Sequence, residues 1–187
     1  MTKSEAVYIK LQRHLDSQAV GFPATKSGSE IKILKHIFTA TEAEIATCLT
    51  FKLESLETVF KRAGHLVESL EKLEGQFDCI EKKGGVELHF KEGKKLYCNA
   101  SLVVGMFEYQ IGKLTPEFIK DFNSYTSNRK FGIEFLSTEL PQMRTIPIAE
   151  SIQLQHNVST FDEVEELLQK AEATSNPGRT LQCYYVA

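Results

Sequence analysis

The sequence predicts a mainly helical α+β protein built around a winged helix-turn-helix domain, which a helical connector segment follows. Two observations carry this prediction. Apolar residues recur at helical spacing through most of the chain before Gly84, and a two-residue period replaces that spacing directly afterwards. We therefore expect an N-terminal helix in residues 1–24, a winged-helix domain in 25–100, a connector or dimerisation segment in 101–175 and a tail in 176–187.

Four helices are expected before the turn at Gly64, in residues 4–16, 29–38, 41–49 and 55–63. Each has apolar residues that fall on one helical face. Thr41 and Glu44 have the spacing of a capping box and should begin the third helix. Ser55 should cap the fourth helix, after a brief extended piece in residues 51–53. Gly64 and His65 should form the turn that follows.

The clearest helical period in the chain comes after that turn. Its apolar stripe consists of Leu66, Leu70, Leu73, Phe77 and Ile80. Because two glycines follow at 84 and 85, we expect this helix to end there.

A β-hairpin is predicted next. Val86, Leu88 and Phe90 alternate with polar residues, Glu92-Gly93 should make the turn, and residues 96–98 should return as a second strand. This order of elements predicts a winged helix. The helix after Gly64 would occupy the recognition position, and the 86–98 hairpin would be the wing.

The pattern changes after residue 100. Residues 103–111 are expected to be helical, and Thr115 with Pro116 should begin a further helix. Its apolar face would consist of Phe118, Phe122 and Tyr125. A short helix is expected in 131–136 and an extended or irregular stretch in 140–158. Thr160 and Glu163 should cap a last helix.

The overall composition is typical of a globular protein. Apolar residues make up 42% of the 187 residues and charged residues 25%, with a formal net charge of −3. That balance argues weakly against a dedicated nucleic-acid binder. The chain shows no signal peptide and no apolar run of membrane-spanning length, so a cytoplasmic location is expected. Four widely spaced cysteines are then expected to be reduced thiols.

The predicted recognition helix does not have the charge of a DNA reader. Residues 68–83 contain five acidic side chains and three basic ones, and the acids dominate the half that would enter the groove. If DNA is bound, the phosphate contacts would come from Lys72, Lys82, Lys91, Lys94 and Lys95. Because the acids would repel phosphates, a protein-interaction or dimerisation role is favoured over DNA binding.

No catalytic or metal-binding motif is found. The five histidines are well separated, no Cys-x-x-Cys unit occurs, and the glycines fit neither a phosphate loop nor a dinucleotide fingerprint. We therefore expect no enzyme activity, no bound metal and no cofactor in this chain.

Four phrases of the sequence resemble a known family. They are VGFPAT (20–25), ILKHIF (33–38), VVGMFEYQ (103–110) and LPQMRTIP (140–147). Together they resemble the N-terminal half of ferredoxin-type iron–sulfur proteins of anaerobic bacteria and archaea. The resemblance covers roughly residues 8–173. It implies a winged-helix region and a helical connector ahead of a domain that binds two [4Fe–4S] clusters.

The chain departs from that family in its cysteines. The clusters need runs of the type C-x₂-C-x₂-C-x₃-C, whereas Cys183 is alone near the end of this sequence. The electron-transfer role is therefore not expected here. The leading hypothesis is a non-enzymatic interaction module that forms a homodimer through residues 102–125 or the 140–158 arm. A winged-helix transcription regulator is the alternative, and no membrane association is expected.

Overall fold

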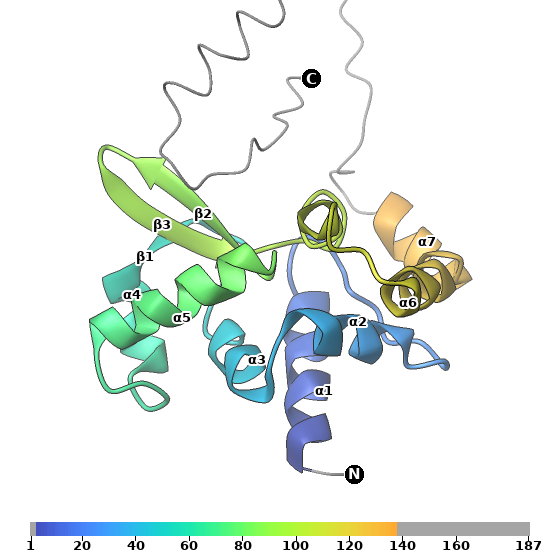
Figure 1. Cartoon of the computed structure of the whole chain (residues 1–187), viewed down its shortest axis with the longest axis horizontal. Coiled ribbons are helices and arrows are strands. Elements are labelled where there is room, and N and C mark those ends of the chain that lie inside the picture. The colour runs from blue at the N-terminus through green and yellow to red at the C-terminus, as the bar shows by residue number, and fades with distance from the viewer. Residues whose placement is uncertain (1–2, 138–187) are drawn as a thin grey trace, which may run out of the picture. The chain divides into compact units, whose positions relative to one another are not determined.

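The computed structural model describes residues 3–137, and this part is a mainly helical α+β protein, as the sequence predicts. It contains seven α-helices, a short 3₁₀ helix and a three-stranded antiparallel sheet (Figure 1). None of these helices is long and apolar enough to cross a membrane. The expectations for the 140–158 arm, the Thr160 helix and the 176–187 tail fall outside the described residues.

The elements follow one another in the predicted order up to the hairpin. They are α1 (Lys3–Asp16), α2 (Ser29–Ile37), α3 (Ala40–Ala46), β1 (Glu54–Ser55), α4 (Leu56–Ala63), α5 (Leu70–Lys82), β2 (Val86–Lys91) and β3 (Lys94–Asn99). The 3₁₀ helix η1 (Glu108–Gln110) and the helices α6 (Pro116–Thr126) and α7 (Arg129–Leu136) complete the described part. Ser55 and Thr115 cap α4 and α6 as predicted.

Helix α3 begins earlier than the sequence indicates. The capping box is formed by Thr39 and Glu42, so the prediction of Thr41 and Glu44 is wrong. The Thr39 N–H donates to Glu42 Oε2 at 2.8 Å, and the Glu42 N–H donates to Thr39 Oγ1 at 3.3 Å. The pair Thr39/Glu42 and the predicted pair Thr41/Glu44 have the same three-residue spacing, so the spacing alone does not distinguish them. Glu42 also forms an ion pair with Lys83, the residue that directly follows α5, and this contact joins segments that are distant in the sequence.

Helix α5 is shorter than its apolar stripe. Ser69 caps it by accepting the Lys72 N–H, so Leu66 lies before the helix, and Leu70 is exposed. Leu73, Phe77 and Ile80 are fully buried as predicted. A local cap therefore outweighs the period of the stripe at its N-terminal end.

No helix spans residues 103–111, contrary to the prediction. Turns and the short η1 take its place. The Ser101 hydroxyl donates to the carbonyls of Val103 and Val104, and the Gly105 N–H donates to the Glu108 carboxylate at 2.6 Å. A Cβ at Gly105 would lie 2.3 Å from the Ser101 carbonyl oxygen. Side-chain bonds to the backbone thus replace helical bonds in this loop.

The sheet has the strand order β1-β3-β2. Its hairpin turns at Glu92 and Gly93, both with positive φ, as expected for the tight turn that the sequence predicts. Leu88 pairs with Tyr97, and Glu87 with Cys98. The Tyr97 ring lies 5.0 Å from that of Phe77, which places α5 against one face of the hairpin.

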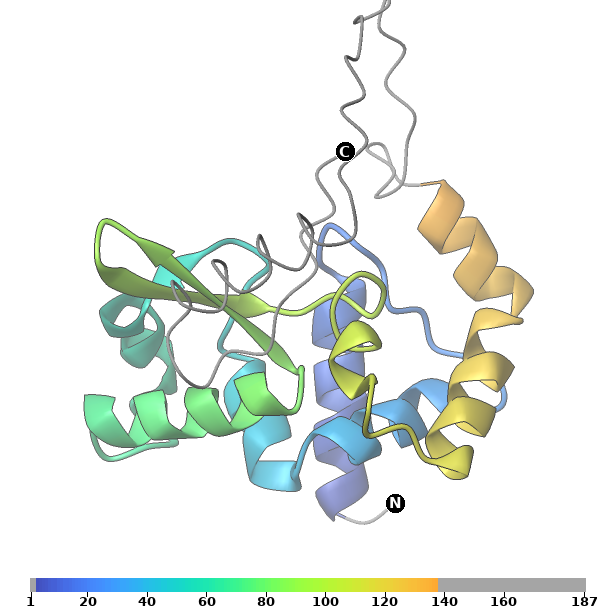
Figure 2. The same ribbon diagram turned by 45° about the horizontal axis from the view of Figure 1, so that its top comes forward.

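One hydrophobic core joins the helices from α1 to α7. Helix α1 packs against α2 and α3, and α6 lies along α2 (Figure 2). The Tyr125 ring of α6 stands 5.1 Å from Phe22 and 4.9 Å from Phe131, and its hydroxyl donates to the Pro23 carbonyl at 3.0 Å. The two helices after the hairpin are therefore anchored to the loop between α1 and α2.

Candidate functional site

Two of the five lysines predicted to contact phosphate are held by acids. Lys72 forms an ion pair with Glu68, one helical turn earlier. Lys95 Nζ lies 2.7 Å from Glu74 Oε1 and 3.5 Å from Asp78 Oδ1 on α5. The hydrogen bond that Lys95 donates to Glu74 raises the pKa of Lys95. To contact DNA, both lysines would have to leave these partners.

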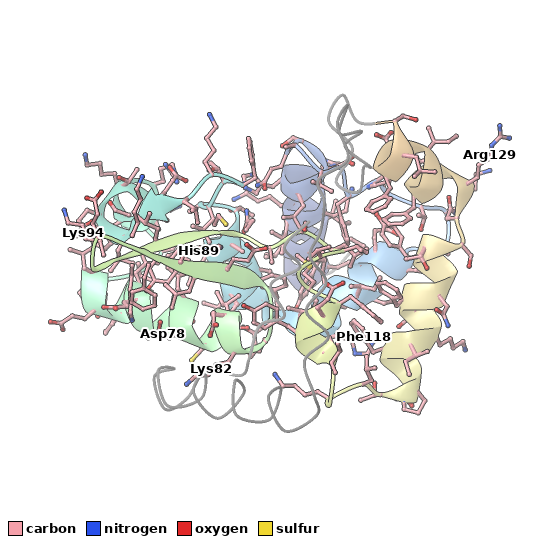
Figure 3. The ribbon with its side chains drawn as sticks, turned by 90° about the horizontal axis from the view of Figure 1, so that it is seen from above. Asp78, Lys82, His89, Lys94, Phe118 and Arg129 are labelled. Carbon is pink, nitrogen blue, oxygen red and sulfur yellow. The ribbon has the colours of Figure 1, made fainter. Side chains whose placement is uncertain are left out.

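The other three lysines do not form one cluster. Lys91 and Lys94 are exposed at the hairpin tip, and within the described residues neither forms an ion pair. Lys82 is exposed near the C-terminal end of α5. Figure 3 shows Lys94 at the end of the hairpin and Lys82 away from it on α5. The basic charge that is not paired with acids is therefore split between two places.

A groove of about 480 Å³ lies between α3 and α5. Ile45, Leu66 and Val67 provide its apolar lining, and Glu68 and Lys72 stand among its polar residues. Gly75 in the middle of α5 leaves the groove open, because no atom lies within 4 Å of where its Cβ would be. The sequence misses this groove because it assigns Leu66 to the helix. Ser69, as a helix cap, is the signal that would have placed Leu66 in the preceding loop.

Exposed apolar side chains gather in the segment between the hairpin and α6. Val104 and Ile111 are 58% and 69% exposed, and Leu114 and Ile119 are exposed as well. Leu114 and Ile119 occupy the two positions of a hydrophobic staple around the Thr115 cap. These residues fall within the 102–125 segment that the sequence proposes for self-association. The alternative arm, 140–158, lies outside the described part.

The histidines and cysteines are dispersed. His14 bonds to the Leu49 carbonyl at 2.6 Å, His36 to Asp121 at 3.3 Å and His89 to Glu87 at 3.2 Å. Of the cysteines in the described part, Cys48 and Cys98 are buried and Cys79 is exposed. Residues 3–137 contain no group of three or more His, Cys, Asp or Glu side chains that could hold a metal. The described cysteines therefore do not fit an iron–sulfur cluster.

Comparison with protein-family models gives no match, and searches of curated proteins and of solved structures give none either.

Proposed function

We propose that residues 25–100 form a winged helix-turn-helix. The order α2, α3, β1, α4, α5, β2, β3 and the strand order β1-β3-β2 support this assignment. In it, α5 takes the recognition position and the β2–β3 hairpin is the wing.

The function that we infer for this chain is that of a non-enzymatic protein-interaction module, in preference to a DNA reader. The pairing of the lysines carries the proposal. Lys72 lies on the N-terminal half of α5, and Lys95 of β3 faces it. Acids of the same domain neutralise both lysines. Releasing a paired lysine to a phosphate exchanges one ion pair for another, which leaves little net gain. The apolar groove beside the same half of α5 also favours a protein partner.

Self-association is the form of interaction that we favour. The exposed apolar side chains at 104, 111, 114 and 119 offer a surface whose burial would stabilise a homodimer. A symmetric dimer would pair this segment with its own copy. Val104 and Ile111 are more than half exposed, so a contact through these two side chains would take nothing out of the core.

Sedimentation velocity on the full chain tests this proposal. We expect a dimer for the wild type and a monomer for the Ile111→Glu/Ile119→Glu double variant, because two charges would be buried at the contact. Leu53→Glu is the matched control, since Leu53 is also exposed but precedes β1. The proposal fails if the wild type is monomeric, or if Leu53→Glu dissociates the dimer as well as the double variant does.

DNA binding by the winged helix is the second candidate. It is supported by Lys91 and Lys94 at the hairpin tip, which are exposed and form no ion pair within residues 3–137. Binding to mixed-sequence duplex DNA should then fall steeply with salt, and Lys91→Gln/Lys94→Gln should weaken it and lower the salt slope by about two. If the double variant binds as the wild type does, the wing makes no phosphate contact.

The relation to ferredoxin-type iron–sulfur proteins is also a proposal, and it rests on the four sequence phrases alone. The resemblance assigns neither an iron–sulfur cluster nor a redox reaction to this chain. A reading frame with paired cysteine runs directly after codon 187 would support it. The absence of such a frame from the gene and its neighbours would count against it.

A further inference from the structure

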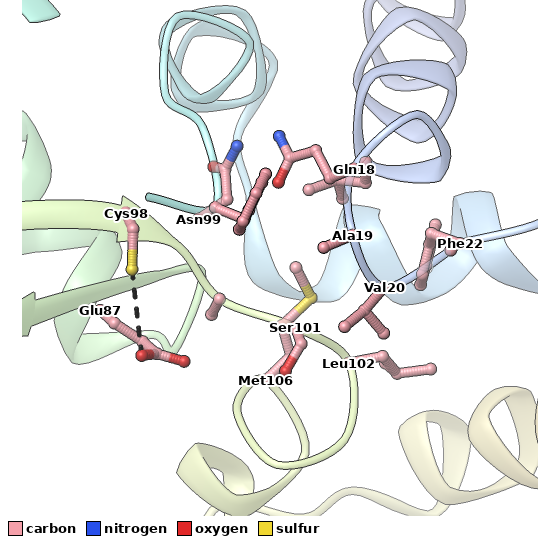
Figure 4. Close-up of a pocket in the computed structure, with 14 residues that line it drawn as sticks. Gln18, Ala19, Val20, Phe22, Glu87, Cys98, Asn99, Ser101, Leu102 and Met106 are labelled. Carbon is pink, nitrogen blue, oxygen red and sulfur yellow. Dashed lines mark hydrogen bonds between the residues drawn. The ribbon is translucent and has the colours of Figure 1, made fainter. Parts of the chain in front are cut away.

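A pocket of about 190 Å³ lies beside the β2–β3 hairpin, with Glu87 and Cys98 in its lining (Figure 4). Cys98 follows Tyr97 in β3, and because alternate side chains point to opposite faces, it faces away from the helix against which Tyr97 packs. Its partner Glu87 lies beside it on the same face. The segment after α1, the residue Phe51 and the 99–106 loop provide the other walls.

The pocket is large enough for a small organic molecule. A cavity of roughly 150 Å³ lined by apolar side chains is known to hold benzene. Here Leu15, Phe22, Phe51, Leu102 and Met106 supply apolar walls. In Figure 4, Val20, Phe22 and Leu102 lie on the side opposite Cys98 and Glu87. The pocket therefore has an apolar side and a polar side.

The charge in this pocket is negative. Glu87 is the single charged side chain among the described residues that line it. Its Oε2 accepts a hydrogen bond from the Cys98 thiol at 4.0 Å and lies 3.2 Å from His89 Nε2. The Glu87 side chain is partly exposed, so its carboxylate can be reached from the pocket. Burial, together with the neighbouring Glu87, raises the pKa of Cys98 to about 12, so the thiol stays protonated and adds no charge.

A second acceptor in the pocket lining lacks a donor. Asn99 is 6% exposed, and its amide nitrogen donates to the Leu49 carbonyl at 3.0 Å. Its Oδ1 is buried and has no hydrogen-bond partner in the described part of the chain. A buried acceptor without a donor is unfavourable. Because Asn99 follows Cys98 in β3, its side chain points to the other face of the strand, so the ligand donor is assigned to the Glu87 carboxylate alone.

We propose that this pocket binds a small organic cation, namely a primary ammonium group on a compact apolar body. The ammonium group would bond to the Glu87 carboxylate, and the body would lie among the apolar side chains. An anion of the same size would be repelled by the Glu87 carboxylate, which is the single charged side chain among the described residues that line the pocket. The pocket and the surface proposed for self-association share the loop that contains Leu102 and Met106, but the charged group of the pocket, Glu87, lies in β2 outside that segment. The two proposals are tested by different variants, so either can fail without the other.

Three probes of nearly equal size test this site: benzylamine, benzyl alcohol and benzoate. Each is titrated into the isotopically labelled full chain while backbone amide shifts are followed. Benzylamine should bind about tenfold more tightly than benzyl alcohol, because its hydrogen bond is made to a charged group. Benzoate should not saturate. The shifts should centre on Gln18, Cys98 and Ser101, which line the pocket.

Two variants and one control locate the binding. Glu87→Gln should lower the affinity for benzylamine about tenfold and leave benzyl alcohol unchanged. Ala19→Phe should fill the pocket and weaken both probes. Glu92→Gln removes an acid at the hairpin turn and should change neither. The proposal is overturned if benzylamine does not saturate, if benzoate binds equally well, or if folded Glu87→Gln keeps the full affinity for benzylamine.

Discussion

Replacing Glu42 should destabilise the protein by more than a surface substitution does. The side chain is 7% exposed and carries two interactions. Its Oε2 accepts the Thr39 N–H at 2.8 Å, and its two oxygens accept Lys83 Nζ at 2.7 and 2.8 Å. The first bond completes the cap of α3, and the second joins α3 to the end of α5. Both are lost in Glu42→Ala.

The magnitude follows from these two interactions. Loss of the capping-box bond from the Thr39 N–H costs about 1 kcal/mol, while the Thr39 hydroxyl still caps the helix. A hydrogen bond to a charged group contributes about 1.5–3 kcal/mol, but Lys83 is 41% exposed, so solvent screening places the pair near or below that lower limit. We expect Glu42→Ala to lower the free energy of unfolding by about 2 kcal/mol and Glu42→Gln by about 1 kcal/mol. Glutamine loses less because its amide oxygen can still accept the Thr39 N–H.

The effect should depend on pH. Burial acts to raise the pKa of Glu42, but the bonds from Lys83 and Thr39 outweigh it and hold the pKa below its ordinary value of 4.5. A carboxyl group with a lowered folded pKa stabilises the protein above its unfolded pKa, and this stability is lost as the pH falls through the folded pKa. The difference between wild type and Glu42→Gln should therefore be full at neutral pH and shrink in acid.

Urea unfolding followed by circular dichroism, at neutral and at acid pH, measures this difference. Glu44→Gln is the matched control, since Glu44 belongs to the capping box that the sequence suggests and the structure does not form. We expect it to change the free energy of unfolding by less than about 0.5 kcal/mol. The reasoning is refuted if Glu44→Gln costs as much as Glu42→Gln, or if the Glu42 effect persists unchanged in acid.

Three further predictions concern the packing of the described part. Gly85→Ala should lower the free energy of unfolding by about 1–3 kcal/mol, because the new Cβ would lie 2.4 Å from a buried phenylalanine ring. Gly75→Ala, where the Cβ would meet open space, should raise it by up to about 1 kcal/mol. Equal effects of the two variants in urea unfolding would contradict this. Tyr125→Phe should cost about 1–2 kcal/mol, since it leaves a buried carbonyl without its donor, and an unchanged unfolding midpoint would count against that bond. In the native protein, iodoacetamide should modify exposed Cys79 well before buried Cys98, whose pKa is about 12, as peptide mass spectrometry can measure; similar rates at both would contradict the burial of Cys98.

Local signals account for the parts of the fold that the sequence predicts correctly. Ser55 and Thr115 stand directly before apolar helical runs and cap the expected helices. The change of period at Gly84 locates the hairpin, and Glu92-Gly93 locates its turn. Each of these signals lies within a few residues of the element that it sets, so no knowledge of distant contacts is needed.

The errors arise where two local solutions compete or where distant residues decide. Thr41 and Glu44 fit a capping box as well as Thr39 and Glu42 do, and the contact of Glu42 with Lys83, 41 positions away, is invisible in the sequence. Residues 103–111 have helical composition, but Ser101 and Gly105 close a tight turn instead.

The candidate site was only partly predictable for the same reason. The acids of α5 are visible in the sequence, and so is the four-residue spacing of Lys72 and Glu68, although Glu68 lies just before the Ser69 cap. The pairing of Lys95 with Glu74 joins a strand to a helix and needs the fold. The groove beside α5 and the pocket around Glu87 are each assembled from separate segments, so no single stretch of sequence indicates them.

Sedimentation equilibrium of the full chain at low salt, with and without mixed-sequence duplex DNA, tests the central proposal most directly. If the chain is a self-associating interaction module, its mass should be that of a dimer, and adding the duplex should not change it. A monomeric mass without DNA would contradict self-association. Complete co-sedimentation with the duplex, lost on adding salt, would favour the DNA-binding alternative instead.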